Sequence, residues 1–64
     1  MRTMAYREAV KAAREVAEEM IWYWRERSWS PYMACQALGL RSHYTWDEVR
    51  DYMTRWWLRN HDAA

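Results

Sequence analysis

The sequence predicts an all-α fold, a small single domain of residues 1–64 with a long, a short and a medium helix in that order. Strong helix formers, chiefly Ala, Glu, Arg and Met, dominate the first part of the chain. The only proline and the only glycine, Pro31 and Gly39, bracket a short middle segment. No stretch alternates apolar and polar residues as a β-strand does. A chain of 64 residues buries only about 60% of the surface that its unfolded form exposes, so a monomer has marginal stability.

The long helix is expected over about residues 3–27. At about 100° per residue, one broad face of this helix is apolar and the opposite arc is charged. We expect the apolar face to form the core, and its members are Ala5, Tyr6, Ala9, Val10, Ala13, Val16, Ala17, Met20, Ile21 and Trp24. The charged arc, expected to face solvent, carries Arg7, Lys11, Arg14, Glu15, Glu18 and Arg25.

The short helix is expected over about residues 31–38. Ser30 is a favourable N-cap, and proline at position 31 suits the first turn, where its missing N–H is not needed. Gly39 is expected to end the helix in the left-handed conformation, with Leu40 as the hydrophobic residue that follows it.

The medium helix is expected over about residues 46–59. Thr45 and Glu48 have the spacing of a capping box, in which each side chain accepts a hydrogen bond from the other residue's backbone N–H. Six apolar residues share an arc of this helix and are expected in the core: Trp46, Val49, Tyr52, Met53, Trp56 and Trp57.

No group of residues in the sequence predicts catalysis, so we do not expect an enzyme or a small-molecule substrate. Cys35 is the only thiol, and it is expected to be a small buried residue rather than a nucleophile. A structural zinc site needs about four ligands at recognisable spacing, and Cys35, His43 and His61 do not show it. One glycine cannot make a phosphate-binding loop. We therefore predict no catalytic residue, no metal site and no cofactor.

The apolar composition is that of an interface more than that of a core. The chain has six Trp, five Tyr and five Met but no Phe, and its ten basic residues are nine Arg and one Lys. Protein interfaces are enriched in Trp, Tyr, Met and Arg and depleted in Lys. A GC-rich coding bias explains the Arg excess equally well, but it does not explain six Trp.

Three apolar residues stand where the helical pattern predicts solvent, and they are the candidate binding residues. Trp22 falls in the middle of the charged arc of the long helix, and Leu58 falls on the polar arc of the medium helix. Trp29 lies in the break between the first two helices. Arg25 and Arg55 complete the predicted binding surface. Several such positions together indicate a contact surface.

The sequence therefore favours a non-enzymatic, cytoplasmic interaction protein that docks an aromatic and Arg-rich surface on a protein partner or on a second copy of itself. Compact chains of this size with few aliphatic residues are typical of accessory factors encoded by phages and plasmids. Inhibitors of host defence, such as anti-CRISPR proteins, are one such class, and the analogy is one of size and composition. A membrane-surface role is not expected, because interfacial helices carry few acidic residues.

Two alternatives remain. In one, the chain is a small DNA-binding regulator, because residues 35–40 are similar to the turn of helix-turn-helix segments, with Cys35 in place of the usual Ala. Asp47, Glu48 and Asp51 oppose this reading, since they would meet phosphates and base edges at the start of the recognition helix. A net charge of +1 also makes DNA the less favoured partner. The second alternative is an engineered helical protein, which the sparse Leu and Lys oppose.

Overall fold

The computed structural model describes residues 5–61, and it confirms the all-α fold of a long, a short and a medium helix. Helix α1 spans Tyr6–Glu26, α2 spans Pro31–Ala37 and α3 spans Trp46–His61. Residues 3 and 4, where the long helix was expected to start, lie outside the described residues. Helix α3 continues two residues beyond its expected end at position 59.

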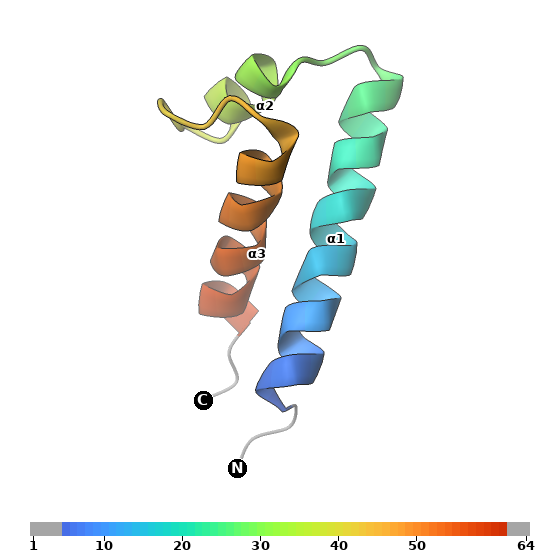
Figure 1. Cartoon of the computed structure of the whole chain (residues 1–64), viewed down its shortest axis with the longest axis vertical. Helices are drawn as coiled ribbons and strands as arrows, with labels where there is room; N and C mark the ends of the chain where they lie inside the picture. Colours follow the sequence, from blue (N-terminus) through green and yellow to red (C-terminus); the bar gives the residue numbers. More distant parts are fainter. Residues whose placement is uncertain (1–4, 62–64) are drawn as a thin grey trace.

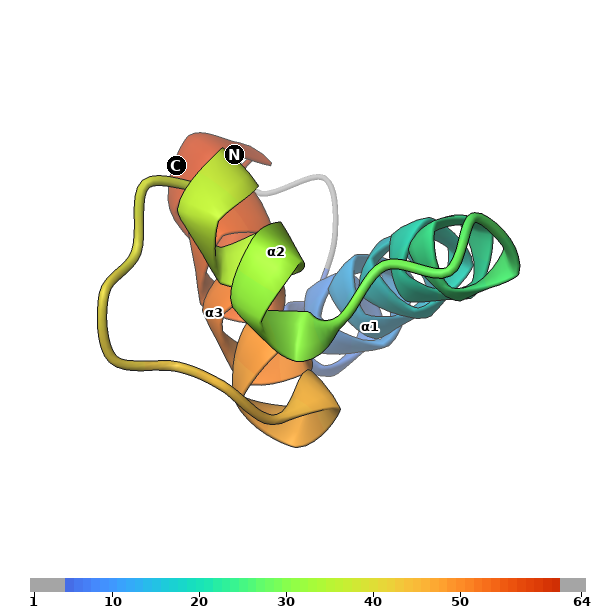
Figure 2. The same cartoon turned by 90° about the horizontal axis from the view of Figure 1, so that it is seen from above.

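The two longer helices run antiparallel, side by side, and α2 lies across the end where α1 finishes and α3 begins (Figure 1). The view from above shows α2 crossing over that end of the pair (Figure 2). The molecule measures 41 × 22 × 14 Å. Along most of their length α1 and α3 form a single layer, and α2 is the only other helix that the structure describes. The pair of long helices therefore has two broad faces, and α2 covers only one end.

The core is small. Ala13 and Ala17 are buried on the stripe of α1 that faces α3. The remaining buried hydrophobic residues form one cluster beneath α2, and they are Ile21, Trp24, Ala34, Cys35 and Val49. The largest side chains that are fully buried are those of Val49 and Cys35. The apolar content of the chain thus greatly exceeds what its own core encloses.

The prediction that the whole apolar arc of each long helix lies in the core is wrong. Val16, Met20 and Trp56 are 42%, 40% and 46% exposed, and Tyr6 is largely exposed as well. The physical reason is the small number of helices that pack against each long helix. A single packed helix covers a narrow stripe, whereas an arc of the expected width needs neighbours on two sides. Here α1 has only α3 along most of its length.

Helix α1 ends in a Schellman motif that the sequence did not suggest. The backbone N–H of Trp29 donates to the carbonyl of Trp24 at 2.9 Å, and that of Ser28 donates to the carbonyl of Arg25 at 3.0 Å. Ser28 takes the left-handed conformation, with φ of 64°, that glycine usually supplies. The Trp29 ring stacks on the Trp24 ring with centroids 5.2 Å apart. This stack is the hydrophobic contact that commonly accompanies the motif.

Helix α2 has the predicted signals at both ends. The Ser30 hydroxyl accepts a hydrogen bond from the backbone N–H of Met33 at 3.2 Å. Gly39 is left-handed, with φ of 78°, and the Leu40 N–H donates to the carbonyl of Cys35 at 2.8 Å. The side chain of Leu40 packs against the buried cluster. Two Schellman motifs therefore turn the chain at the two ends of this short connection.

Helix α3 begins with the predicted capping box. The Thr45 hydroxyl accepts from the Glu48 N–H at 3.1 Å, and the Glu48 carboxylate accepts from the Thr45 N–H at 3.2 Å. The same carboxylate also accepts from the Tyr44 N–H at 3.2 Å. These hydrogen bonds favour the charged form and hold the pKa of Glu48 below its ordinary value of 4.5.

We expect opposite effects from two substitutions at the left-handed positions. Ser28→Gly should raise the free energy of unfolding by about 1 kcal/mol, because it relieves the strain of a side chain at positive φ. Gly39→Ala should lower it by about 1–2 kcal/mol. A Cβ at Gly39 meets no neighbouring atom within 4 Å, so that loss reports backbone strain alone. Urea titration measures both. A loss of stability in Ser28→Gly would contradict the assigned strain.

The capping box is expected to make stability depend on pH in the acidic range. Thr45→Ala should lower the free energy of unfolding by about 0.5–2 kcal/mol at pH 7, because the N-cap acceptor is lost. Since the folded pKa of Glu48 is depressed, its contribution is present above the unfolded pKa and disappears as pH falls through the folded pKa. Thermal melts between pH 6 and pH 2.5 should show a smaller acid loss for Glu48→Gln than for the wild type. An identical acid loss in both would contradict this role of the carboxylate.

Candidate interaction surface

An apolar groove lies between α1 and α3 and is closed at one end by α2. Its volume is about 370 Å³. Eight residues line it and define it below: Val16 and Met20 from α1, Ala37 and Leu38 from α2, and Tyr52, Met53, Trp56 and Trp57 from α3. No charged side chain is among them. The groove thus brings together three of the nine large hydrophobic residues that the described structure leaves exposed, Val16, Met20 and Trp56.

The helical repeat explains why these side chains gather there. Val16 and Met20 are four residues apart, as are Tyr52 and Trp56, so each pair stands one turn above the other on its helix. Both pairs flank the stripe along which the helices touch. They border the groove from opposite sides, where Val16, Met20 and Trp56 are exposed and Tyr52 is half-buried.

Local packing contacts fix the side chains at the two ends of the groove. At the closed end, Leu38 packs against the buried cluster and ends α2 as its C-cap. Near the other end, the ring of His61 stacks on that of Trp57 with centroids 4.3 Å apart. The imidazole also approaches the Trp57 carbonyl, with Nδ1 at 3.1 Å. Trp57 is thereby half-buried, and Trp56 is left as the most exposed tryptophan of the groove.

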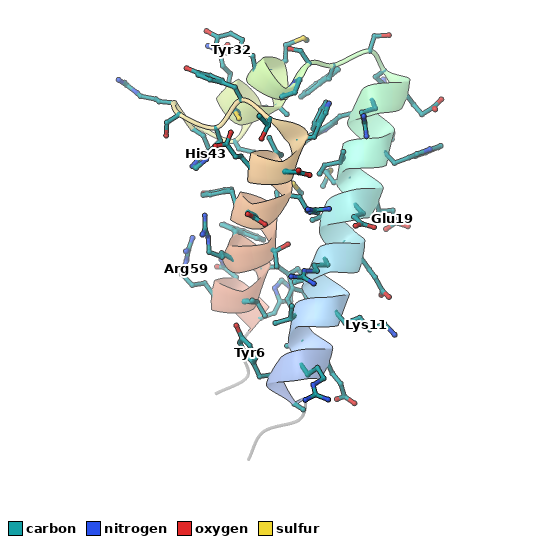
Figure 3. All side chains as sticks on the ribbon, in the orientation of Figure 1. Tyr6, Lys11, Glu19, Tyr32, His43 and Arg59 are labelled. Carbon is teal, nitrogen blue, oxygen red and sulfur yellow. The ribbon has the colours of Figure 1, made fainter. Side chains whose placement is uncertain are left out.

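The outer edges of the two long helices differ in charge. Four exposed acidic residues follow one another along the edge of α1 that faces away from α3, namely Glu8, Glu15, Glu19 and Glu26. The corresponding edge of α3 is mixed, with Glu48 and Asp51 toward its amino end and Arg55 and Arg59 toward its carboxyl end. Figure 3 shows Glu19 and Arg59 pointing to opposite sides of the helix pair. Lys11 also projects on the α1 side, but its position in the helical repeat turns it further from the groove.

Trp22 and Arg25, two of the predicted binding residues, lie on a different side of α1 from the groove. The Trp22 side chain is 62% exposed, as its helical position predicts. It lines a hollow of about 260 Å³ together with Arg25 and Trp46. The Arg25 guanidinium lies 5.6 Å from the centre of the Trp46 ring. Two ion pairs border this hollow, since Arg50 lies 3.6 Å from Glu18 and 3.4 Å from Asp47.

The other predicted binding residues do not join Trp22. Trp29 is half-buried, because it stacks on Trp24 at the end of α1. Leu58, also half-buried, and the exposed Arg55 lie near the carboxyl end of α3. Trp22 lies near the carboxyl end of α1, and because the helices are antiparallel these are opposite ends of the molecule. The structure thus unites Trp22 with Arg25 only, and Arg55 lies on the outer edge of α3.

Sequence reasoning missed the groove because its residues were assigned to the core. The sequence did carry a signal, which is the number of bulky apolar side chains. Three helices of this length, with so few aliphatic residues, cannot enclose side chains as large as those of Trp56, Trp57, Met20 and Met53. That excess indicates a surface that another molecule covers.

The thiol of Cys35 is buried on the inner face of α2 and is not activated. Burial raises its pKa above the ordinary value of 9.0, and the nearby charge of Glu48 raises it further. A nucleophilic cysteine requires the opposite shift. Within residues 5–61, no three His, Cys, Asp or Glu side chains come close enough together to hold a metal ion.

The helix-turn-helix alternative concerns α2, α3 and the loop between them. Asp47 and Glu48 occupy the first turn of α3, as the sequence indicates. Glu48 is engaged in the capping box and Asp47 pairs with Arg50. Carboxylates at this position are unfavourable neighbours for phosphate.

Searches against protein-family models, curated proteins and solved structures find no match to this chain. None of the helices described here is long and apolar enough to cross a membrane.

We expect Cys35 to be protected from thiol reagents in the folded protein. At pH 8 its reaction with a chromogenic disulfide should be at least about tenfold slower than in denaturant, because the thiolate is disfavoured and the sulfur is covered. Since the folded pKa is raised, stability should be unaffected below the unfolded pKa and should fall as pH rises beyond it. Equal rates in the folded and denatured protein would contradict the burial of this residue.

Proposed function

We propose that this chain is a non-enzymatic interaction protein whose working surface is the apolar groove. The observation that supports the proposal most directly is the exposure of Val16, Met20 and Trp56 around one uncharged hollow. Solvent contact with so much apolar surface is unfavourable, and a protein partner that covers it gains the corresponding free energy.

The shape of the groove favours an amphipathic helix as its ligand. It runs between two antiparallel helices, which is how helix-in-groove recognition presents its docking surface. Met20 and Met53 have flexible, polarizable side chains that adapt to a partner, and Trp56 provides the large aromatic area typical of binding hot spots.

The biological setting that we propose is an analogy of size and composition, and the groove is compatible with it. An inhibitor encoded by a phage or plasmid acts by covering part of a host protein, and an apolar groove on a small rigid chain is suited to that task. A cytoplasmic setting agrees with a single buried thiol that takes part in no disulfide. The acidic first turn of α3 makes a protein partner more favourable than DNA.

The proposal predicts that Trp56 contributes to binding and contributes less to folding than a core tryptophan does. Trp56→Ala should lower the free energy of unfolding in dilute solution by about 2 kcal/mol, since nearly half of the side chain is already in solvent and only about 100 Å² of it is covered. A core tryptophan would cost about 3–5 kcal/mol. The same change should weaken binding at least about tenfold, or about 1.4 kcal/mol.

Trp22→Ala is the matched control, because it removes an exposed tryptophan from another side of α1. Tagged wild type and both variants are mixed with host lysate and, separately, with the untagged chain, and the retained proteins are quantified. Retention by the wild type and Trp22→Ala, with loss in Trp56→Ala, supports the groove. Loss with Trp22→Ala alone assigns binding to the predicted Trp22 and Arg25 surface and refutes the proposal.

A further inference from the structure

We propose that the occupant of the groove is a basic amphipathic helix of a partner protein, with Lys or Arg along the border of its apolar stripe that lies over α1. The inference rests on the proposed function, because it takes the groove as the working surface and adds the charge of the helix that fills it. The charged side chains beside the groove, on α1 and on α3, lead to it.

The border of the groove on α1 is acidic. A shallow hollow on the outer side of α1 shares Val16 with the groove. Its lining includes three carboxylates and no basic side chain, and it consists of Ala12, Glu15, Val16, Glu18, Glu19 and Trp22. A helix that lies in the groove against Val16 therefore has carboxylates along this side.

The charge of Glu19 is not offset by its neighbours. Residues three or four positions apart are neighbours on a helix surface. Around Glu19 these neighbours are uncharged or acidic, namely Glu15, Val16, Trp22 and Tyr23. Among the residues that the structure describes, neither Glu15 nor Glu19 takes part in an ion pair, whereas Glu18 is paired with Arg50 at 3.6 Å. The carboxylates of Glu15 and Glu19 are therefore available to a partner.

Two basic residues lie at the margins of this border. Lys11 is four residues before Glu15 and offsets part of its charge, but its position in the helical repeat turns it away from the groove. Arg27 lies about two turns beyond Glu19, and its guanidinium lies over the ring of Tyr23 at 4.5 Å. The stretch of α1 that borders the groove thus keeps a net negative charge.

The border on α3 is balanced. Asp51 and Arg55 are four residues apart on its outer edge, at the level of the groove. Glu48 and Arg59 follow about one turn beyond them in either direction. Acidic and basic side chains therefore offset each other along α3, and the net charge beside the groove is that of the acidic border on α1.

A helix with basic residues on the side facing α1 complements this border. Opposite charges at the rim of an interface speed association and fix orientation, whereas like charges repel. A second copy of the chain does not provide such a helix, because its α3 has the balanced edge. The basic residues of its α1 lie on the opposite side from the groove, and they are Arg7, Lys11, Arg14 and Arg25. Charge complementarity therefore favours a basic partner helix over a second copy.

Two labelled peptides test the charge of the partner. Both are amphipathic helices with the same apolar stripe, and one carries Lys along one border of the stripe where the other carries Glu. Fluorescence anisotropy with the full chain at low salt should show the Lys peptide binding at least about tenfold more tightly. The difference should shrink as salt is raised, because exposed charges are screened.

Charge variants of exposed residues assign this preference to the border of the groove. Glu15→Gln with Glu19→Gln should reduce it to about threefold or less, and Glu15→Lys with Glu19→Lys should reverse it. The matched control is Glu8→Gln with Glu26→Gln, which removes the same charge toward the two ends of α1 and should keep the wild-type preference. Circular dichroism of each variant confirms that it is helical.

The outcomes separate this inference from the function on which it rests. Equal binding of both peptides, lost in Trp56→Ala, overturns the basic partner and leaves the proposed function standing. Loss of the preference in the control pair alone overturns the border at Glu15 and Glu19 as its cause. Binding that is unchanged in Trp56→Ala overturns both proposals, because the peptide then lies outside the groove. A chain that binds neither peptide overturns the inference, and light scattering then shows whether a second copy fills the groove.

Discussion

The contact between α1 and α3 is the constraint on which the rest of the structure depends. On the α1 side it is made by Ala13 and Ala17, which are fully buried and have almost no side chain. Small residues let two helices approach closely, but they extend the contact sideways very little. The larger residues one step around the helix, Val16 and Met20, are consequently left beside the contact rather than within it. The groove is the direct result of packing two helices through a stripe this narrow.

The local signals at the helix ends decide where the chain can turn, and with it where α2 lies. Ser28 and Gly39 both adopt positive φ, and each is followed by a residue that folds back on its helix, Trp29 on Trp24 and Leu40 toward Cys35. These two turns leave α2 only seven residues long and place it over one end of the pair. A helix that short cannot cover a face about 22 Å wide and 41 Å long. The open face therefore follows from the turns as much as from the helix pair.

The sequence was informative where the physics is local and misleading where it is not. The ends of α2 to within one residue, the capping box at Thr45 and the left-handed Gly39 depend on neighbours within a few residues, and the sequence predicted them. Burial depends on how many elements pack around a helix, which periodicity does not reveal, so Met20 and Trp56 were placed in a core that does not reach them. Trp29 was taken for a surface residue because serine, unlike glycine, gives no sign of a Schellman motif. Trp22 was placed correctly in solvent because the middle of a charged arc is exposed whatever packs on the other side.

The groove and its outer edges differ in charge, and this difference affects how each would contribute to binding. All eight groove residues are uncharged, so covering them removes no ionised group from water and incurs little desolvation penalty. The charged side chains, among them Glu15, Glu19, Arg55 and Arg59, lie at the outer edges, where they stay solvated when the groove is covered and add little to affinity. In the function that we propose, affinity therefore comes from the aromatic and Met side chains of the groove.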